Sequence, residues 1–235
     1  MAEFLNFKRQ GETITVLPDK AVFLPSRKTL LVSDIHLGKG QAFRARQFFA
    51  PAGVCAADLQ RLLQVVTAYK AERLIILGDL VHSRDGINEE LDRLFLDFRA
   101  KTKNVETILV LGNHDLRVNF SSKWRLSLVN GGFEEDGFFF EHGDENTKAQ
   151  INENNKTNRS GLFRFSGHIH PAVRLHGAGK ASERMPCFWL RSRERCLVLP
   201  SFGRLTGAFT VSPQTSDRVF IPLYDEGNIL EVTLK

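Results

Sequence analysis

The sequence predicts an α/β fold in which two mixed β-sheets pack face to face, flanked by helices, so that the chain forms four layers. Three apolar runs, which end before Asp34, Gly78 and Gly112, are branched and do not alternate with polar residues, as expected of parallel strands buried on both faces. Between these runs, apolar residues recur at the spacing of an α-helix. After Trp124 the strands become shorter and are joined by glycine turns, and strand-like runs after Pro171 indicate a second sheet.

The first half of the chain is predicted to be a series of strands and helices. Residues 1–27 contain two short strands, at 13–16 and 21–24, joined by a turn. After the strand before Asp34, apolar residues at 59, 62, 63, 66 and 69 recur at helical spacing. A second helix follows Asn88, which can cap it. Right-handed crossovers then bring the three motif-bearing strands into one parallel sheet.

The second half is predicted to be more antiparallel. A strand ends at His142, and the runs at 187–190 and 196–199 contribute further strands. Residues 144–160 are polar and rich in asparagine, so we expect a mobile loop between two motifs, either a lid or a tolerated insertion. No linker divides the chain, and we expect one domain over residues 1–235.

Composition limits the class of protein. The first ten residues lack the apolar core of a secretory signal, and no stretch has the 18 apolar residues that a membrane span needs. We therefore expect a cytoplasmic protein with no membrane partner. Three cysteines without a CxxC pair favour free thiols over disulfides or a thiolate zinc site. The net charge of +5 agrees with a polyanionic partner but is shared by many enzymes.

Most of the candidate metal ligands follow apolar runs directly. Five motifs contain them: SerAspIleHis at 33–36, GlyAsp at 78–79, GlyAsnHisAsp at 112–115, HisGlyAsp at 142–144 and GlyHisIleHis at 167–170. Open α/β sheets bind ligands at the carboxyl ends of their strands, so these side chains are expected to converge on one site. Each motif alone occurs in ordinary turns. All five in order, each after a strand, predict a catalytic metal site.

The residue types indicate two metal ions and phosphate-ester hydrolysis. Two cations about 3.5–4 Å apart can hold both the attacking and the leaving oxygen of a phosphodiester. Asp79 is the natural bridge, because each carboxylate oxygen can bind one metal, and Asn113 offers a neutral oxygen. The remaining candidates are Asp34, His36, His142, His168 and His170. Imidazole and carboxylate without thiolate favour manganese, with iron or zinc as alternatives.

The five motifs resemble those of calcineurin-like metallophosphoesterases over residues 33–170. The resemblance implies that family's four-layer αββα fold. It also implies one metal held by Asp34, His36, Asp79 and His170, and a second held by Asp79, Asn113, His142 and His168. A metal-bridging hydroxide would attack phosphorus in line. His114 would correspond to the family's general acid or charge stabiliser on the leaving-group side, which suits a side chain that titrates near neutral pH.

His82 departs from the phosphoprotein-phosphatase branch of the family. GlyAspxxAsp in that branch is GlyAspLeuValHis here, so His82 stands where a carboxylate orients the catalytic histidine. A histidine followed by SerArg is similar to the nuclease subunit of the double-strand-break repair complex, which favours nucleic-acid diesters. The alternative is that His82 is a hydrogen-bonded supporting residue with no catalytic part.

A closer likeness covers most of the chain. Residues 36–44, the turn at 51–53, residues 78–84 and residues 199–207 resemble a bacterial branch, the ligase-associated DNA-damage-response endonucleases, which are manganese-dependent phosphodiesterases. The resemblance implies DNA repair with DNA as the partner, and association with a DNA ligase or helicase. Lys39, Arg44 and Arg84 are then candidates for binding substrate phosphate, although each could instead pair with a nearby carboxylate. The 201–207 segment either closes over the metals or turns between strands.

Three functions remain possible from the sequence. The first is a metal-dependent DNA nuclease in repair. The second is a hydrolase of small nucleotides, cyclic diesters or nucleotide pyrophosphates, which an enclosed pocket would favour over an open basic crevice. The third is an inactive scaffold with the same fold, which the complete ligand set and His114 argue against. A late cluster, Arg184, Arg191, Arg193 and Arg195, is either a solvated strand face or a DNA-backbone contact.

Overall fold

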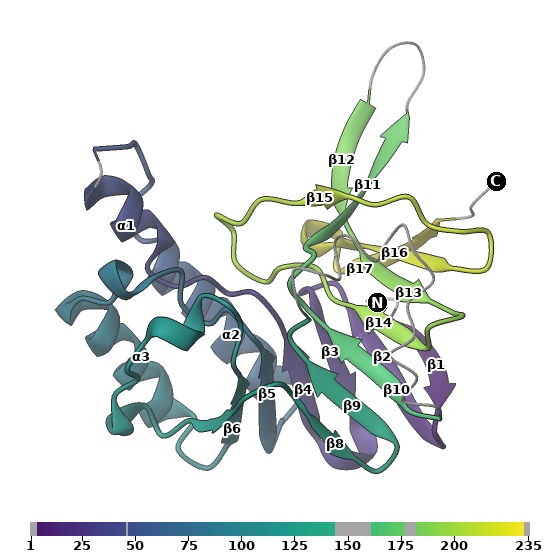
Figure 1. Ribbon diagram of the computed structural model, residues 1–235, viewed down its shortest axis with the longest axis horizontal. Coiled ribbons are helices and arrows are strands. Elements are labelled where there is room, and N and C mark those ends of the chain that lie inside the picture. The colour runs from purple at the N-terminus through teal and green to yellow at the C-terminus, as the bar shows by residue number, and fades with distance from the viewer. Residues whose placement is uncertain (1–3, 46, 144–160, 177–181, 233–235) are drawn as a thin grey trace.

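The computed structural model describes residues 4–45, 47–143, 161–176 and 182–232. Two seven-stranded sheets pack face to face, with the helices against the outer face of the first (Figure 1). In spatial order the first sheet contains β1 (Leu5–Arg9), β2 (Glu12–Leu17), β3 (Ala21–Leu24), β4 (Thr29–Val32), β5 (Arg73–Leu77), β6 (Glu106–Val110) and β7 (Ser127–Val129). Strands β1 to β4 pair antiparallel and β4 to β7 pair parallel, so the sheet is mixed as predicted.

The second large sheet is also mixed. Its spatial order is β17 (Asn228–Val232), β16 (Arg218–Leu223), β13 (Phe188–Arg191), β14 (Cys196–Val198), β10 (Phe163–Ser166), β9 (Phe138–Glu141) and β8 (Phe133–Glu135). β10 pairs parallel with both β9 and β14, whereas the other pairs are antiparallel. The prediction of a more antiparallel second half is therefore correct in general, and the parallel pair β9–β10 matters most because both strands end in motifs.

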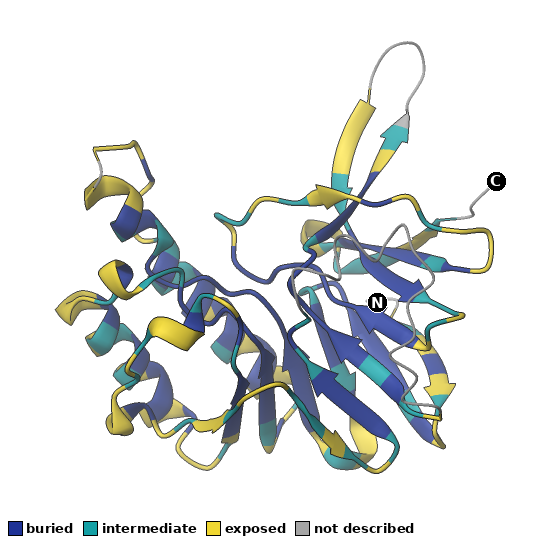
Figure 2. Ribbon diagram, in the orientation of Figure 1, coloured by how far each residue is buried: buried dark blue, intermediate teal, exposed yellow. Residues whose placement is uncertain are grey.

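Both faces of the first sheet are buried along β4, β5 and β6, which explains why these strands lack alternation (Figure 2). Leu30 and Val32 of β4 face helices α2 (Val54–Ala68) and α3 (Glu89–Lys101), whereas Leu31 faces the second sheet. Successive side chains of a strand point to opposite faces, so a strand between two cores needs apolar residues throughout. The core between the sheets is rich in phenylalanine, including Phe138, Phe140, Phe163, Phe165, Phe188 and Phe220.

The fold class is confirmed, with one difference in the layers. In the described part of the chain, α1 (Lys39–Ala45), α2 and α3 all lie on the first sheet's side. The outer face of the second sheet packs against a small third sheet of β12 (Ser182–Pro186), β11 (Pro171–His176) and β15 (Phe209–Thr210). The residues of these three strands lack apolar residues at helical spacing, and they form a β-layer where a helical layer was expected.

The predicted helices are present, with shifted boundaries. The first begins at Val54, five residues before the first apolar position of the helical pattern at 59, and follows Gly53, which has a positive φ of 76°. The second begins after Asn88, whose side chain accepts a hydrogen bond of 2.9 Å from the Leu91 amide, as a capping asparagine does. Strand β1 and helix α1 were not predicted. The loop expected at 144–160 lies outside the described residues.

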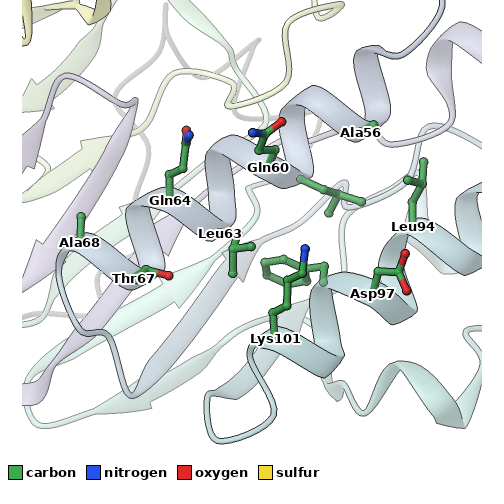
Figure 3. A pocket seen from close by; sticks show the side chains of 11 residues that line it. Ala56, Gln60, Leu63, Gln64, Thr67, Ala68, Leu94, Asp97 and Lys101 are labelled. Carbon is green, nitrogen blue, oxygen red and sulfur yellow. The ribbon is translucent and has the colours of Figure 1, made fainter.

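An open pocket between α2 and α3 is lined by Leu59, Leu63, Leu94 and Phe98 with polar residues at its rim (Figure 3). None of its lining residues belongs to the five motifs. Among the helices in the described ranges, none has the length and apolar character needed to cross a membrane.

Candidate metal centre

The five motifs meet where the two sheets meet. They follow β4, β5 and β6 of the first sheet and β9 and β10 of the second. Backbone hydrogen bonds join them: the Asp34 amide donates to the Gly78 carbonyl at 3.1 Å, and the Gly167 amide donates to the His142 carbonyl at 3.1 Å. The His168 amide donates to Asp34 Oδ2 at 2.9 Å, which links the two sheets directly. Parallel pairing within each sheet therefore places residues up to 136 positions apart in one cluster, since 170 − 34 = 136.

Asp34, His36 and His170 form the first group of candidate ligands. One ligand atom from each lies within 4.8 Å of the others. His170 Nε2 is 3.0 Å from Asp34 Oδ1, and His36 Nε2 is 3.5 Å from Asp79 Oδ2. His170 Nδ1 lies 3.1 Å from the Gly207 carbonyl oxygen, an arrangement that fixes the ring and turns Nε2 toward the carboxylate.

Asp79, His142 and His168 form the second group, again with ligand atoms within 4.8 Å. His142 Nε2 is 3.6 Å from Asp79 Oδ2 and 3.2 Å from Asn113 Oδ1. His142 Nδ1 lies 2.9 Å from the Leu77 carbonyl oxygen, which orients this ring as Gly207 orients His170. Asp79 faces both groups, because its Oδ2 approaches His36 on one side and His142 on the other.

The backbone of the cluster is unusual. Five of the seven candidate ligands, namely Asp34, His36, Asp79, His168 and His170, have positive φ angles between 50° and 67°. A non-glycine residue in this region costs about 1–2 kcal/mol and persists only where its surroundings enforce it. The strain aims successive side chains into the same space, an arrangement that regular strand geometry does not allow.

The electrostatics of the cluster suit divalent cations. Burial alone would raise the pKa of Asp34, but its hydrogen bond with His170 and the nearby His142 and His36 hold that pKa below its ordinary range. Burial lowers the pKa of His36 to about 2, so its imidazole is neutral, as metal binding requires. Burial raises the pKa of Asp79. Neither ring nitrogen of His36 has a hydrogen-bond partner among the described residues, although the ring is buried. Two buried carboxylates and unpartnered neutral imidazole nitrogens fit a pair of cations.

His114 stands beside the cluster with its side chain 34% exposed. Its amide donates to Asp79 Oδ1 at 3.0 Å, and its Nδ1 contacts the backbone carbonyl of His82. The rings of His82 and His114 stack at 5.1 Å. The resemblance placed His82 where a related branch has a carboxylate that orients the catalytic histidine, with a supporting residue as the alternative. In the structure the His82 carbonyl makes the hydrogen-bond contact and the side chain contributes the ring stack.

Sequence reasoning missed Asp115, the last residue of the third motif. This buried carboxylate accepts from the amides of Gly112 at 3.0 Å, Val81 at 3.3 Å and Leu80 at 3.4 Å, so it ties the second and third motif loops together. Burial raises its pKa to about 6. The signal was present in the GlyAsnHisAsp motif itself, because an Asp three residues after a strand-end glycine can accept amide hydrogens of the turn.

The 201–207 segment is built into the centre and is more than a turn between strands. The Phe202 amide donates to the Ser33 carbonyl at 2.8 Å, and the Gly203 amide donates to the Asp34 carbonyl at 3.2 Å. From α2, the buried Arg61 donates to the Phe202 carbonyl, and Asp58 accepts from the Arg204 amide at 3.2 Å. The segment therefore supports the backbone of Asp34 and, through Gly207, the ring of His170.

The predicted phosphate-binding side chains lie at the rim of the cluster. Lys39 begins α1 and is partly buried, and burial lowers its pKa. Arg84 is exposed. Arg44 Nη1 donates to the carbonyls of Ala50 at 3.2 Å and Pro51 at 3.0 Å, so it is held by backbone and not by a carboxylate. Their binding of substrate phosphate stays a prediction.

The late arginines lie on two elements, β12 and the β13–β14 hairpin. Arg191 pairs with Glu194 at 3.0 Å, and Arg195 donates to the Gly161 carbonyl at 3.0 Å, so both serve the β13–β14 hairpin. Arg184 is exposed on the third sheet, opposite Arg174. The structure therefore favours a solvated strand face for Arg191 and Arg195.

We expect Gly78→Ala to disrupt the centre. A Cβ at Gly78 would overlap the His142 ring, and the residue has a φ of +77°. The left-handed backbone should cost about 1–2 kcal/mol of unfolding free energy, and the overlap about a further 1–3 kcal/mol. Gly131→Ala is a matched control, because φ is +73° and no atom lies within 4 Å of the added Cβ. Equal losses in urea denaturation of the two variants would contradict tight packing at Gly78.

Comparison with known proteins agrees with the geometry. Residues 27–176 match the calcineurin-like phosphoesterase family. The crystal structure of Pseudomonas putida nuclease MPE is 26% identical, with a TM-score of 0.78 over 98% of this chain and 100% of that chain. Yfce, a phosphoesterase from E. coli, is 15% identical over 88% of this chain and 99% of that chain, with a TM-score of 0.43. No curated protein sequence gave a match. The chain belongs to the calcineurin-like phosphoesterase family and is a metal-dependent phosphoesterase.

Proposed function

We propose that this protein is a dinuclear-metal-dependent phosphodiesterase that cleaves DNA. The observation that carries the proposal is that two groups of candidate ligands meet at Asp79, whose Oδ2 lies 3.5 Å from His36 Nε2 of the first group and 3.6 Å from His142 Nε2 of the second. The end-to-end likeness to a bacterial nuclease supports nucleic acid as the substrate class. A role in DNA repair and a DNA ligase or helicase partner rest on the resemblance of the motifs alone. Manganese rests on that resemblance and on the imidazole and carboxylate ligands, and a cytoplasmic location is an expectation from composition.

The ligand assignment follows from the two groups. Asp34, His36 and His170 would hold one cation and His142, His168 and Asn113 the other, with Asp79 contributing to both. When bound, the two cations would neutralise phosphate charge and make water a better nucleophile near neutral pH. The carbonyls of Leu77 and Gly207 hold His142 and His170 in the orientation that binding needs. Positioning before the reaction is the protein's main contribution.

His114 is the proposed proton donor to the leaving oxygen. Its exposed ring reaches the side of the cluster open to solvent, with Nε2 3.9 Å from Asp79 Oδ2. A carbonyl oxygen only accepts hydrogen bonds, so the contact between His114 Nδ1 and the His82 carbonyl requires a proton on Nδ1. Nε2 is then the nitrogen that can give up or take up the transferred proton. A histidine held in this way can deliver a proton as the P–O bond breaks.

The test is manganese-dependent hydrolysis of four substrates: bis-p-nitrophenyl phosphate, p-nitrophenyl phosphate, single-stranded DNA and duplex DNA. We expect cleavage of the diester and of DNA, with little cleavage of the monoester, and loss of both activities in Asn113→Ala. Cleavage of the diester without cleavage of DNA would favour a hydrolase of small nucleotides. Inactivity with every divalent metal would favour a scaffold and contradict the proposal.

A further inference from the structure

We propose that Phe43, Phe48 and Phe49 form a subsite that stacks the bases of unpaired nucleotides beside the metal centre. This inference rests on the proposed function and adds a specificity-determining surface to it. Phe49, at 94%, and Phe48, at 65%, are the two most exposed large apolar residues in the described ranges. Neighbouring exposed apolar side chains, unlike single ones, mark interaction sites on soluble proteins. We refer to these three residues as the aromatic platform.

The aromatic platform is continuous with the catalytic side chains. From the cluster outward, the His36 and His82 ring centroids are 5.6 Å apart, and His82 and Phe43 are 6.0 Å apart. Phe43 and Phe48 follow at 6.5 Å, and Phe49 is the next residue in sequence. A strand whose phosphate lies at the cluster would therefore place adjacent bases over the rings of Phe43 and Phe48, with the exposed Phe49 next in the chain.

Charge at the platform fits a polyanion. Lys39 Nζ lies 5.8 Å from the Phe43 ring centroid, and in the sequence Lys39 stands between the first motif and Phe43. Surfaces that bind single strands combine cations that follow the phosphates with aromatic rings on which bases stack. Stacking needs an exposed base face, which a nucleotide offers when it is unpaired or flipped out of a duplex.

Contacts of the backbone constrain both ends of the segment that carries the platform. Arg44 donates to the carbonyls of Ala50 and Pro51, which closes the segment that contains Phe48 and Phe49. At the start of α1, a Cβ on Gly38 would lie 3.0 Å or less from the backbone of Gly86, so the two segments pack without room for a side chain. When a ligand binds a backbone that is already ordered, the protein loses little further conformational entropy.

Nucleotide bases fit this surface better than a protein partner or a bilayer. The platform is small, contains a cation against an aromatic face, and borders the residues that would bind the scissile phosphate. Protein docking and membrane insertion do not require this nearness to the cluster. We therefore assign the platform to the substrate and treat the other occupants as outcomes of the test.

The test compares two oligonucleotides with the manganese-loaded enzyme: one with bases throughout, and one with abasic units on both sides of the cleaved phosphate. We expect the wild type to have a KM about 10- to 100-fold lower for the base-bearing strand. Phe49→Ala should lose most of this preference with little change in kcat, and Phe49→Trp should restore it. Fluorescence anisotropy should give the same order of affinities.

Phe4→Ala is the matched control, because Phe4 is also exposed but packs on Tyr69 at the end of α2, away from the motifs. It should keep the full preference for bases. If the wild type cleaves DNA and Phe49→Ala keeps the preference, the platform proposal is wrong and the nuclease function stands. If the wild type cleaves neither strand, the proposed function fails and the platform proposal fails with it.

Discussion

Asp79→Asn should bind metal poorly and lose at least about 100-fold in kcat/KM for a phosphodiester. Changes to groups that only support metal ligands already cost about 10- to 100-fold, and Asp79 faces both ligand groups directly. The substitution keeps an oxygen that can accept the His114 amide, so the loss reports the missing carboxylate charge and bridge. Metal per chain, measured after dialysis against manganese, should fall from two to one or fewer.

The control for this variant is Asp92→Asn. Asp92 lies on α3, and its Oδ1 accepts a hydrogen bond of 2.7 Å from the Trp124 indole. An asparagine can still accept that hydrogen bond. We expect this variant to bind two metals and retain activity. An Asp79→Asn protein with two metals and unchanged kcat/KM would contradict the bridging role.

His114→Ala should retain both metals and lose about 10²- to 10⁴-fold in kcat on DNA. The residue approaches Asp79 only at 3.9 Å and stands at the exposed side of the cluster, where a leaving oxygen would need a proton. The loss should be small with bis-p-nitrophenyl phosphate, because p-nitrophenolate departs readily without protonation. Equal losses on the two substrates would contradict proton donation and favour charge stabilisation.

His82→Ala separates the two contacts that hold His114. The backbone carbonyl of His82 remains in this variant, and only the ring stack at 5.1 Å is removed. We therefore expect a smaller loss than in His114→Ala, with the same dependence on the leaving group. A loss as large as that of His114→Ala would show that the His82 side chain itself takes part in catalysis.

Much of the fold was predictable because local pattern and tertiary environment agree. The branched runs before Asp34, Gly78 and Gly112 are buried on both faces, and a parallel sheet requires that pattern. Once these strands are parallel, their ends coincide, so the convergence of the motifs follows from topology. The Asn88 cap was predictable because capping is a local interaction.

The features that were missed depend on distant contacts or on weak local signals. Helix α1 has only seven residues, contains Gly40 and exposes Phe43, so it lacks an amphipathic stripe. The left-handed backbone at His36 and His170 has only a weak sequence signal, because histidine is enriched at positive φ but adopts it in few positions. The support of Asp34 by residues 201–207 joins segments about 170 positions apart, which periodicity does not reveal.

The most direct test of the central claim is anomalous diffraction at the manganese edge from crystals grown with Mn²⁺. The account predicts two peaks that share Asp79, one beside Asp34, His36 and His170 and the other beside Asn113, His142 and His168. A single peak, or peaks that do not contact Asp79, would contradict the dinuclear centre on which the proposed phosphodiesterase depends.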